Sequence, residues 1–120
     1  MSKHTPETIL RCDHCGLDVT DLYADVAFAH SHSDDPARCL LLCKKRHCNI
    51  KFNSMGSHPL AVFADRETGL KFLAGATLYA RLDVEGWQRW IQITWAAAAV
   101  ASPEQRKAGR EQGEALDSIG

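Results

Sequence analysis

The sequence lacks a long apolar run. Its longest apolar stretch, residues 90–101, is interrupted by Gln92 and Thr94, and a transmembrane helix needs about 20 apolar residues. The first seven residues, which include Lys3, His4 and Glu7, contain no apolar core of a signal peptide. We therefore expect a protein of the reducing cytoplasm, with no membrane partner. There, clustered cysteines serve as metal ligands or reactive thiols before they form disulfides.

The signatures of several enzyme classes are also missing. The chain contains no glycine-rich phosphate loop, no Gly-x-Ser-x-Gly nucleophile elbow and no paired glutamates typical of acid–base catalysis. Its 120 residues are too few for a large multidomain enzyme. These absences favour a binding module over an enzyme.

The formal net charge of −1 conceals an uneven distribution. Residues 1–35 hold seven acidic and two basic residues, whereas residues 36–64 hold five basic residues and no acid. The basic residues are Arg38, Lys44, Lys45, Arg46 and Lys51. Either the two segments neutralise each other within one domain, or the basic segment faces the phosphates of a nucleic acid.

All five cysteines and all six histidines lie within residues 1–58. Cys12 and Cys15 form a Cys-x2-Cys pair followed by Gly16, a spacing that lets one tight turn direct two thiolates at a tetrahedral ion. Cys43 and Cys48 complete an all-thiolate set. The large apolar side chains of this segment are few, so a single structural zinc ion could stabilise it by about 10 kcal/mol or more.

The second pair of ligands has alternatives. His47 can stand in for Cys48, because positions i and i+4 share one face of a helix. Cys39 can replace Cys43 if the segment is extended. A redox switch is the competing interpretation, in which the spare cysteine, such as Cys39, is oxidised first and nearby Lys44 and Lys45 lower a thiol pKa.

Two resemblances involve the histidines. The stretch from His30 through His32 and Asp34 to Asp35 is similar to the His-x-His-x-Asp-His motif of the metallo-β-lactamase superfamily, with Asp35 in place of the last histidine. The chain lacks the length and the further ligands of that fold, so this resemblance implies at most a second metal at His30, His32 and Asp34.

The wider resemblance spans about residues 12–52. The Cys12–Cys15 pair, a strand that ends in His30 and the run Leu41-Leu-Cys43-Lys-Lys-Arg-His47-Cys48 together resemble the treble-clef core of HNH endonucleases. The resemblance implies a zinc knuckle, a hairpin and a helix that carries metal ligands. It places His30 or His32 at the general base that activates water, beside a divalent metal that stabilises the leaving phosphate.

The downstream half divides into strands and helices. Residues 60–64 and 70–73 flank a turn at 65–69, and the alternation over 78–84 is typical of a strand with one buried face. Residues 85–101 have helical period and carry Trp87, Trp90 and Trp95. We expect the alanine-rich end of this helix to pack in the core rather than on a partner.

A second helix is expected from residue 103. Ser102 can cap it, Pro103 suits its first position and Gln105 completes a capping box. The residues that follow are mostly charged and few are apolar. We therefore expect a marginal, exposed helix or tail over 102–120 that frays near its end.

The predicted fold class is α+β: a small zinc-stabilised N-terminal half resembling a treble clef or zinc ribbon, an antiparallel β-hairpin or meander, and C-terminal helices. Residues 1–101 would form one domain, with a zinc-binding part at 10–58, a β part at 59–84 and the tryptophan-rich helix at 85–101. Residues 102–120 would add the charged helix or tail.

The predicted function is that of a small cytoplasmic regulatory module, such as an inhibitor of a larger assembly. It would hold one structural Zn²⁺ and bind a nucleic acid or a protein without catalysis of its own. The basic residues or the tryptophan-rich helix would contact that partner. The alternatives are an HNH-like nuclease that uses His30 or His32, and a redox-sensing zinc protein.

Overall fold

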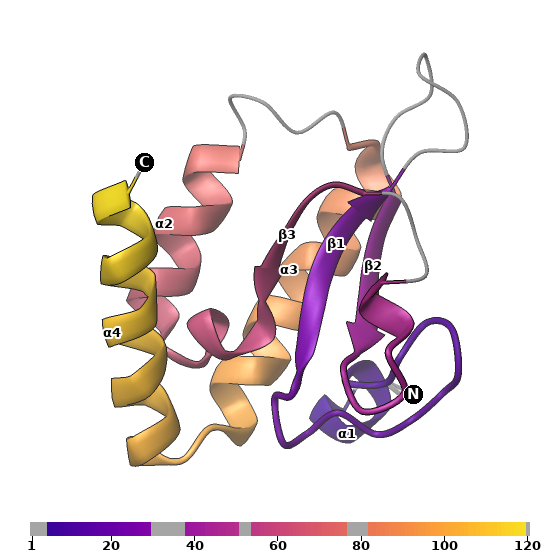
Figure 1. Cartoon of the computed structure of the whole chain (residues 1–120), viewed down its shortest axis with the longest axis horizontal. Helices are drawn as coiled ribbons and strands as arrows, with labels where there is room; N and C mark the ends of the chain where they lie inside the picture. Colours follow the sequence, from indigo (N-terminus) through magenta and orange to yellow (C-terminus); the bar gives the residue numbers. More distant parts are fainter. Residues whose placement is uncertain (1–4, 30–37, 51–53, 77–81, 120) are drawn as a thin grey trace.

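The computed structural model describes residues 5–29, 38–50, 54–76 and 82–119. Three strands form one antiparallel sheet, and helices cover it, so the predicted α+β class is confirmed (Figure 1). In chain order the elements are α1 (Pro6–Ile9), β1 (Ala24–Ala29), β2 (Arg38–Cys43), η1 (Cys48–Ile50), β3 (Ser54–Pro59), η2 (Leu60–Ala64), α2 (Arg66–Ala76), α3 (Val84–Val100) and α4 (Pro103–Ile119).

The central strand of the sheet is β1, because the strand order is β2-β1-β3. Val26 on β1 lies opposite Leu41 on β2 and His58 on β3, so these three side chains share one face of the sheet. Val26, Ala27 and Leu41 are all buried. Both faces of β1 are therefore covered, as a central strand with an apolar sequence requires.

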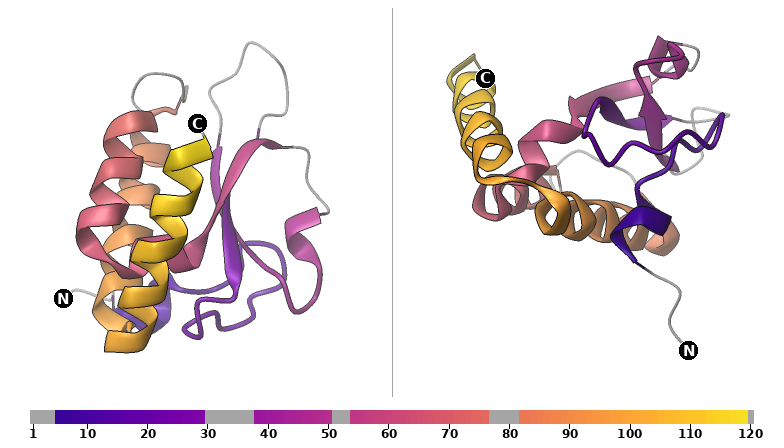
Figure 2. Two further views of the ribbon diagram at one scale, coloured as in Figure 1. Left: turned by 60° about the vertical axis from the view of Figure 1, so that its left-hand side comes forward. Right: turned by 90° about the horizontal axis from the view of Figure 1, so that it is seen from below.

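Helix α3 covers the face that carries Val26. Asp83 caps its first turn by accepting the backbone N–H of Gly86 at 2.8 Å. Trp90, fully buried, meets the Phe28 ring of β1 at a centroid distance of 4.7 Å. The second view in Figure 2 shows α3 along one side of the sheet. Helix α1 lies beside one end of α3 in the same view. The predicted helix at 85–101 is thus confirmed, and it packs on the sheet.

The predicted β part at 59–84 is wrong. Residues 60–64 form the short 3-10 helix η2 and residues 66–76 form the α-helix α2. Asp65 does not begin a hairpin turn. Its carboxylate accepts the backbone N–H of Thr68 at 3.1 Å and the Thr68 hydroxyl at 2.6 Å, which is helix-capping geometry. Of the strand expected at 78–84, residues 78–81 lie outside the described residues, and α3 already begins at Val84.

The capping box of the last helix is confirmed. Ser102 donates its N–H to Gln105 Oε1 at 2.8 Å, and Gln105 donates its N–H to Ser102 Oγ at 3.1 Å. The expected helix is present as α4 and most of its described residues are exposed, but Gly109 and Gly113 are buried against η2 and α2. The absent side chains of these glycines allow α4 to approach closely. No helix in the described part of the chain is both long and apolar enough to cross a membrane.

Candidate metal centre

The first two cysteines lie in a tight turn before β1. Cys12 donates its N–H to the carbonyl of Leu17, and Gly16 donates its N–H to the carbonyl of Cys12, both at 2.9 Å. Gly16 adopts a φ of 77°, a left-handed value that glycine accepts without steric cost. The knuckle therefore closes at the glycine, as its position after Cys15 predicts.

The second pair comes from the end of β2 and the start of η1. Cys43 is the last residue of β2, and Cys48 is the first residue of η1. A turn joins them, in which the N–H of His47 reaches the carbonyl of Lys44 at 3.0 Å. Because this segment is not an α-helix, His47 does not lie one helical turn from Cys43 as predicted. His47 is exposed whereas Cys48 is buried.

The ligand atoms of the four cysteines converge. The Sγ atoms of Cys12, Cys15, Cys43 and Cys48 all lie within 4.8 Å of one another, and those of Cys15 and Cys43 are 3.6 Å apart. A zinc ion with bonds of about 2.3 Å to four sulfurs sets them about 3.8 Å apart. The donor set thus fits one tetrahedral, thiolate-preferring ion, and the predicted ligand set is the one that the structure brings together.

Backbone N–H groups already stabilise thiolates at the knuckle. Those of His14, Cys15 and Cys43 point at Cys12 Sγ, at 3.4, 3.5 and 3.4 Å. Burial opposes ionisation of Cys12, but these three donors outweigh it and hold its pKa below the ordinary value. The N–H of Leu17 lowers the pKa of Cys15 to about 6. Both residues are therefore prepared to bind a cation as thiolates.

The pKa of Cys48 shifts in the opposite direction. Burial and the neighbouring sulfurs of Cys43, Cys15 and Cys12 raise its pKa to about 12. Four thiolates cannot be held so close together by backbone donors alone, because each added negative charge penalises the next. A divalent cation at the centre of the cluster would remove that penalty. Without an ion Cys48 therefore remains a neutral thiol at neutral pH, and a bound cation is what would allow all four sulfurs to be thiolates.

Asp13 connects the knuckle to the rest of the fold. Its N–H donates to the carbonyl of Leu41, and its Oδ2 accepts the N–H of Leu41, both at 2.7 Å. Its Oδ1 lies 3.1 Å from the guanidinium of Arg89 on α3, which also donates to the carbonyl of Ile9 at 3.3 Å. The ligand-bearing turn is thus fastened to β2, α1 and α3. Sequence reasoning missed this connection because the partners of Asp13 lie far away along the chain.

Cys39 is separate from the cluster. It lies on β2 beside α3 and is not among the four converging cysteines. Burial raises its pKa to about 12, so it holds little thiolate at neutral pH. Neither alternate ligand, Cys39 or His47, is therefore needed at the cluster, and Cys39 is poorly suited to be the first thiol oxidised in a redox sensor.

Two of the basic residues are paired with acids of the N-terminal segment. Lys44 lies 3.6 Å from Asp25 and 5.5 Å from the centre of the Tyr23 ring, and Lys45 lies 2.9 Å from Asp21. For these two, neutralisation within the domain is the interpretation that the structure supports. Arg38 and Arg46 are exposed, and Lys51 lies outside the described residues.

The remaining predicted site residues have mixed outcomes. His30, His32 and Asp34 lie outside the described residues, so the nuclease general base stays a prediction. Trp90 is buried, and Trp87 is half-buried and stacks on it at a centroid distance of 5.8 Å. Trp95 is 51% exposed. Of the three tryptophans, only Trp95 presents a large free surface to a partner.

Comparison with protein-family models, curated proteins and solved structures gives no match. The treble-clef resemblance of residues 12–52 therefore stays a prediction, and the cluster geometry carries the functional argument.

Proposed function

We propose that this chain is a non-catalytic zinc module that binds a protein partner. The observation that carries the proposal is the convergence of the Sγ atoms of Cys12, Cys15, Cys43 and Cys48 within 4.8 Å. A zinc ion held there would join the knuckle to the end of β2 and to η1. Its task would be structural, because four protein ligands leave no open position for a substrate or a water.

Metal analysis tests the zinc. Protein purified without chelator should contain one zinc ion per chain, and Cys12, Cys15, Cys43 and Cys48 should resist alkylation until the zinc is removed. The same four-sulfur geometry suits iron, so the elemental identity of the ion must be measured by mass spectrometry. Protein that contains no tightly bound metal, and in which a chelator does not change the reactivity of these four thiols, would overturn the proposal.

The exposed face of α3 supports a protein as the partner. Val84, Ile91 and Trp95 lie on one side of the helix and are 72%, 52% and 51% exposed. Aromatic and aliphatic side chains grouped on an exposed face are typical of protein interfaces. The alternative, a nucleic acid, is less favoured because Lys44 and Lys45 already pair with Asp25 and Asp21, and a paired lysine has less charge to offer a phosphate.

A matched set of variants separates the two partners. Ile91→Glu with Trp95→Glu should abolish co-purification of the partner from the native cell. Ile50→Glu, an equally radical change at a residue 75% exposed on η1, should leave it intact. Binding to duplex DNA and to RNA, titrated against salt, should be weak and unchanged by Lys44→Ala with Lys45→Ala. Tight, salt-dependent binding that this double variant weakens would favour the nucleic acid instead.

A further inference from the structure

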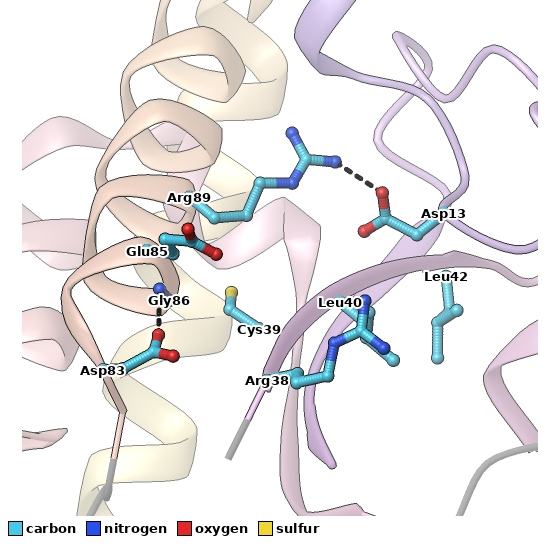
Figure 3. Close-up of a pocket in the computed structure, with 9 residues that line it drawn as sticks. All are labelled: Asp13, Arg38, Cys39, Leu40, Leu42, Asp83, Glu85, Gly86 and Arg89. Carbon is cyan, nitrogen blue, oxygen red and sulfur yellow. Dashed lines mark hydrogen bonds and ion pairs between the residues drawn. The ribbon is translucent and has the colours of Figure 1, made fainter. Parts of the chain in front are cut away.

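A cavity of about 530 Å³ lies between the edge strand β2 and the first turn of α3 (Figure 3). Its volume is within the range of ligand-binding sites. Cys39 and Leu42 of β2 line one part, Asp83 and Glu85 of α3 line another, and Asp13 of the knuckle lies at one end. Neither the metal cluster nor the exposed Ile91 and Trp95 surface includes this cavity.

The outer edge of β2 presents its backbone to this cavity. Leu41 directs its N–H and carbonyl away from β1, because both bond to Asp13, and the N–H of Cys43 likewise reaches Cys12 Sγ. Backbone groups along a strand alternate in direction with a period of two. Those of Cys39 therefore point the same way as those of Leu41, into the cavity. Asp13 thus pairs with Leu41 much as a residue on a neighbouring strand would, and the cavity begins next to this pair, at Cys39.

The two walls of the cavity differ in chemistry. Asp83 and Glu85 place carboxylates on the α3 side, towards which Figure 3 shows the Cys39 sulfur directed. Arg38, Leu40 and Leu42 alternate with Cys39 along β2 and line the opposite side. Within the described residues, Arg38 and Glu85 take part in no ion pair, whereas Arg89 is occupied by Asp13. The walls are thus acidic on one side, and apolar with one arginine on the other.

We propose that this cavity binds an extended peptide segment of a partner protein, which adds to the edge of β2 next to Asp13. Side chains of an added strand point alternately to the two sides. A basic side chain would face Glu85, and its neighbours, apolar or acidic, would face Leu40 and Arg38. The main chain supplies affinity and the alternation supplies specificity. The inference rests on the proposed function, because the zinc would hold Asp13 in its place beside Leu41.

The test uses the zinc-loaded protein, with its zinc content verified first, and synthetic nine-residue peptides. One pool alternates lysine with valine, a second alternates glutamate with valine, and a third has the composition of the first in non-alternating order. Titration followed by backbone NMR should show the first pool shifting the amide signals of Cys39 and Glu85. The first pool should bind about threefold more tightly than the second, as one exposed ion pair implies, and more tightly than the third, whose side chains do not alternate.

Charge reversal makes the assignment specific. Glu85→Lys should invert the preference between the lysine and glutamate pools, whereas Glu104→Lys, at an exposed acid on the distant α4, should not. Methylation of the peptide backbone nitrogens should abolish binding, because strand pairing needs those donors. Three results would each overturn the proposed peptide site. They are equal binding of the third pool, binding that survives methylation, and no shift at Cys39 in protein that holds its zinc. Those results would leave the metal centre standing.

Discussion

The N-terminal part, residues 5–59, and the helical part, residues 60–119, are stabilised in different ways. The helical part has an aromatic interior of its own, in which Phe63 meets Trp90 and Phe72 at centroid distances of 6.1 and 6.3 Å. In the N-terminal part, four sulfur atoms from two distant segments gather at one point. Packing distributes stabilisation over many contacts, whereas a metal site concentrates it in four ligands. The two parts should therefore respond very differently to single substitutions.

The largest effect is expected from loss of one metal ligand. Cys43→Ser should abolish zinc binding and destabilise the N-terminal part by an amount approaching the about 10 kcal/mol that a structural zinc contributes. Cys39→Ser, four residues earlier on the same strand and also buried, should keep the zinc and lose far less stability. Zinc content together with thermal unfolding, with and without a chelator, measures both. Equal zinc loss in the two variants would contradict the assigned ligand set.

The next largest effect is expected in the helical part. Trp90→Ala removes the largest fully buried side chain and should cost about 3–5 kcal/mol, with the zinc content unchanged. Trp95→Ala, five residues further along the same helix and half exposed, should change stability by less than about 0.5 kcal/mol. Trp90→Phe should cost less than Trp90→Ala, because the buried indole N–H has no hydrogen-bond partner among the described residues. Denaturant unfolding of the four proteins checks the order.

A smaller effect is expected where α4 meets η2. A Cβ atom at Gly109 would overlap the backbone carbonyl oxygen of Ala61, and a backbone atom cannot move aside as a flexible side chain can. Gly109→Ala should therefore destabilise the protein by about 1–3 kcal/mol, although alanine is the better helix former. Gln112→Ala on the exposed side of α4 should be nearly neutral. A stabilised Gly109→Ala variant would show that α4 does not pack as described.

The contrast between the parts also explains what the sequence could predict. The cysteine knuckle was predictable because Cys12, Cys15 and Gly16 make a local pattern with one chemical purpose. The second pair was only narrowed to a few candidates, since the choice between His47 and Cys48 depends on whether the segment is helical. The fastening role of Asp13 was invisible, because it depends on Leu41 and Arg89, which lie 28 and 76 residues away along the chain.

The prediction of β structure at 59–84 was wrong for a different reason. A short apolar run such as 60–64 does not distinguish a strand from a turn of helix by periodicity. The segment is helical because Asp65 caps α2 through Thr68 and because of its tertiary packing. The packing of α4 was missed because the buried residues in its described part are Gly109 and Gly113, which carry no apolar side chain for a pattern to register. The α3 helix was predictable because its apolar period continues for several turns.

The smallest predicted effect concerns the contact between the two parts. His58 on β3 lies among rings of both, 6.1 Å from Phe28, 5.1 Å from Phe72 and 6.3 Å from Trp90 in centroid distance. Burial there lowers its pKa below the ordinary 6.5. As the pH falls through 6.5, the unfolded chain binds a proton that the folded chain resists. The free energy of unfolding should therefore decrease towards acid pH and be unaffected by His58 above pH 7.

His58→Phe isolates this contribution from the acid lability of the thiolates. Both proteins lose zinc as their cysteines are protonated, so that loss cancels when their unfolding free energies are subtracted at each pH. The remaining difference should be constant above pH 7 and should shift in favour of His58→Phe below 6.5, where only the native side chain must be kept neutral at a cost. Denaturant unfolding between pH 5 and 8 measures it. A difference that is flat with pH would mean that His58 is solvated when folded, and that the sheet and the helices meet less tightly than these ring distances indicate.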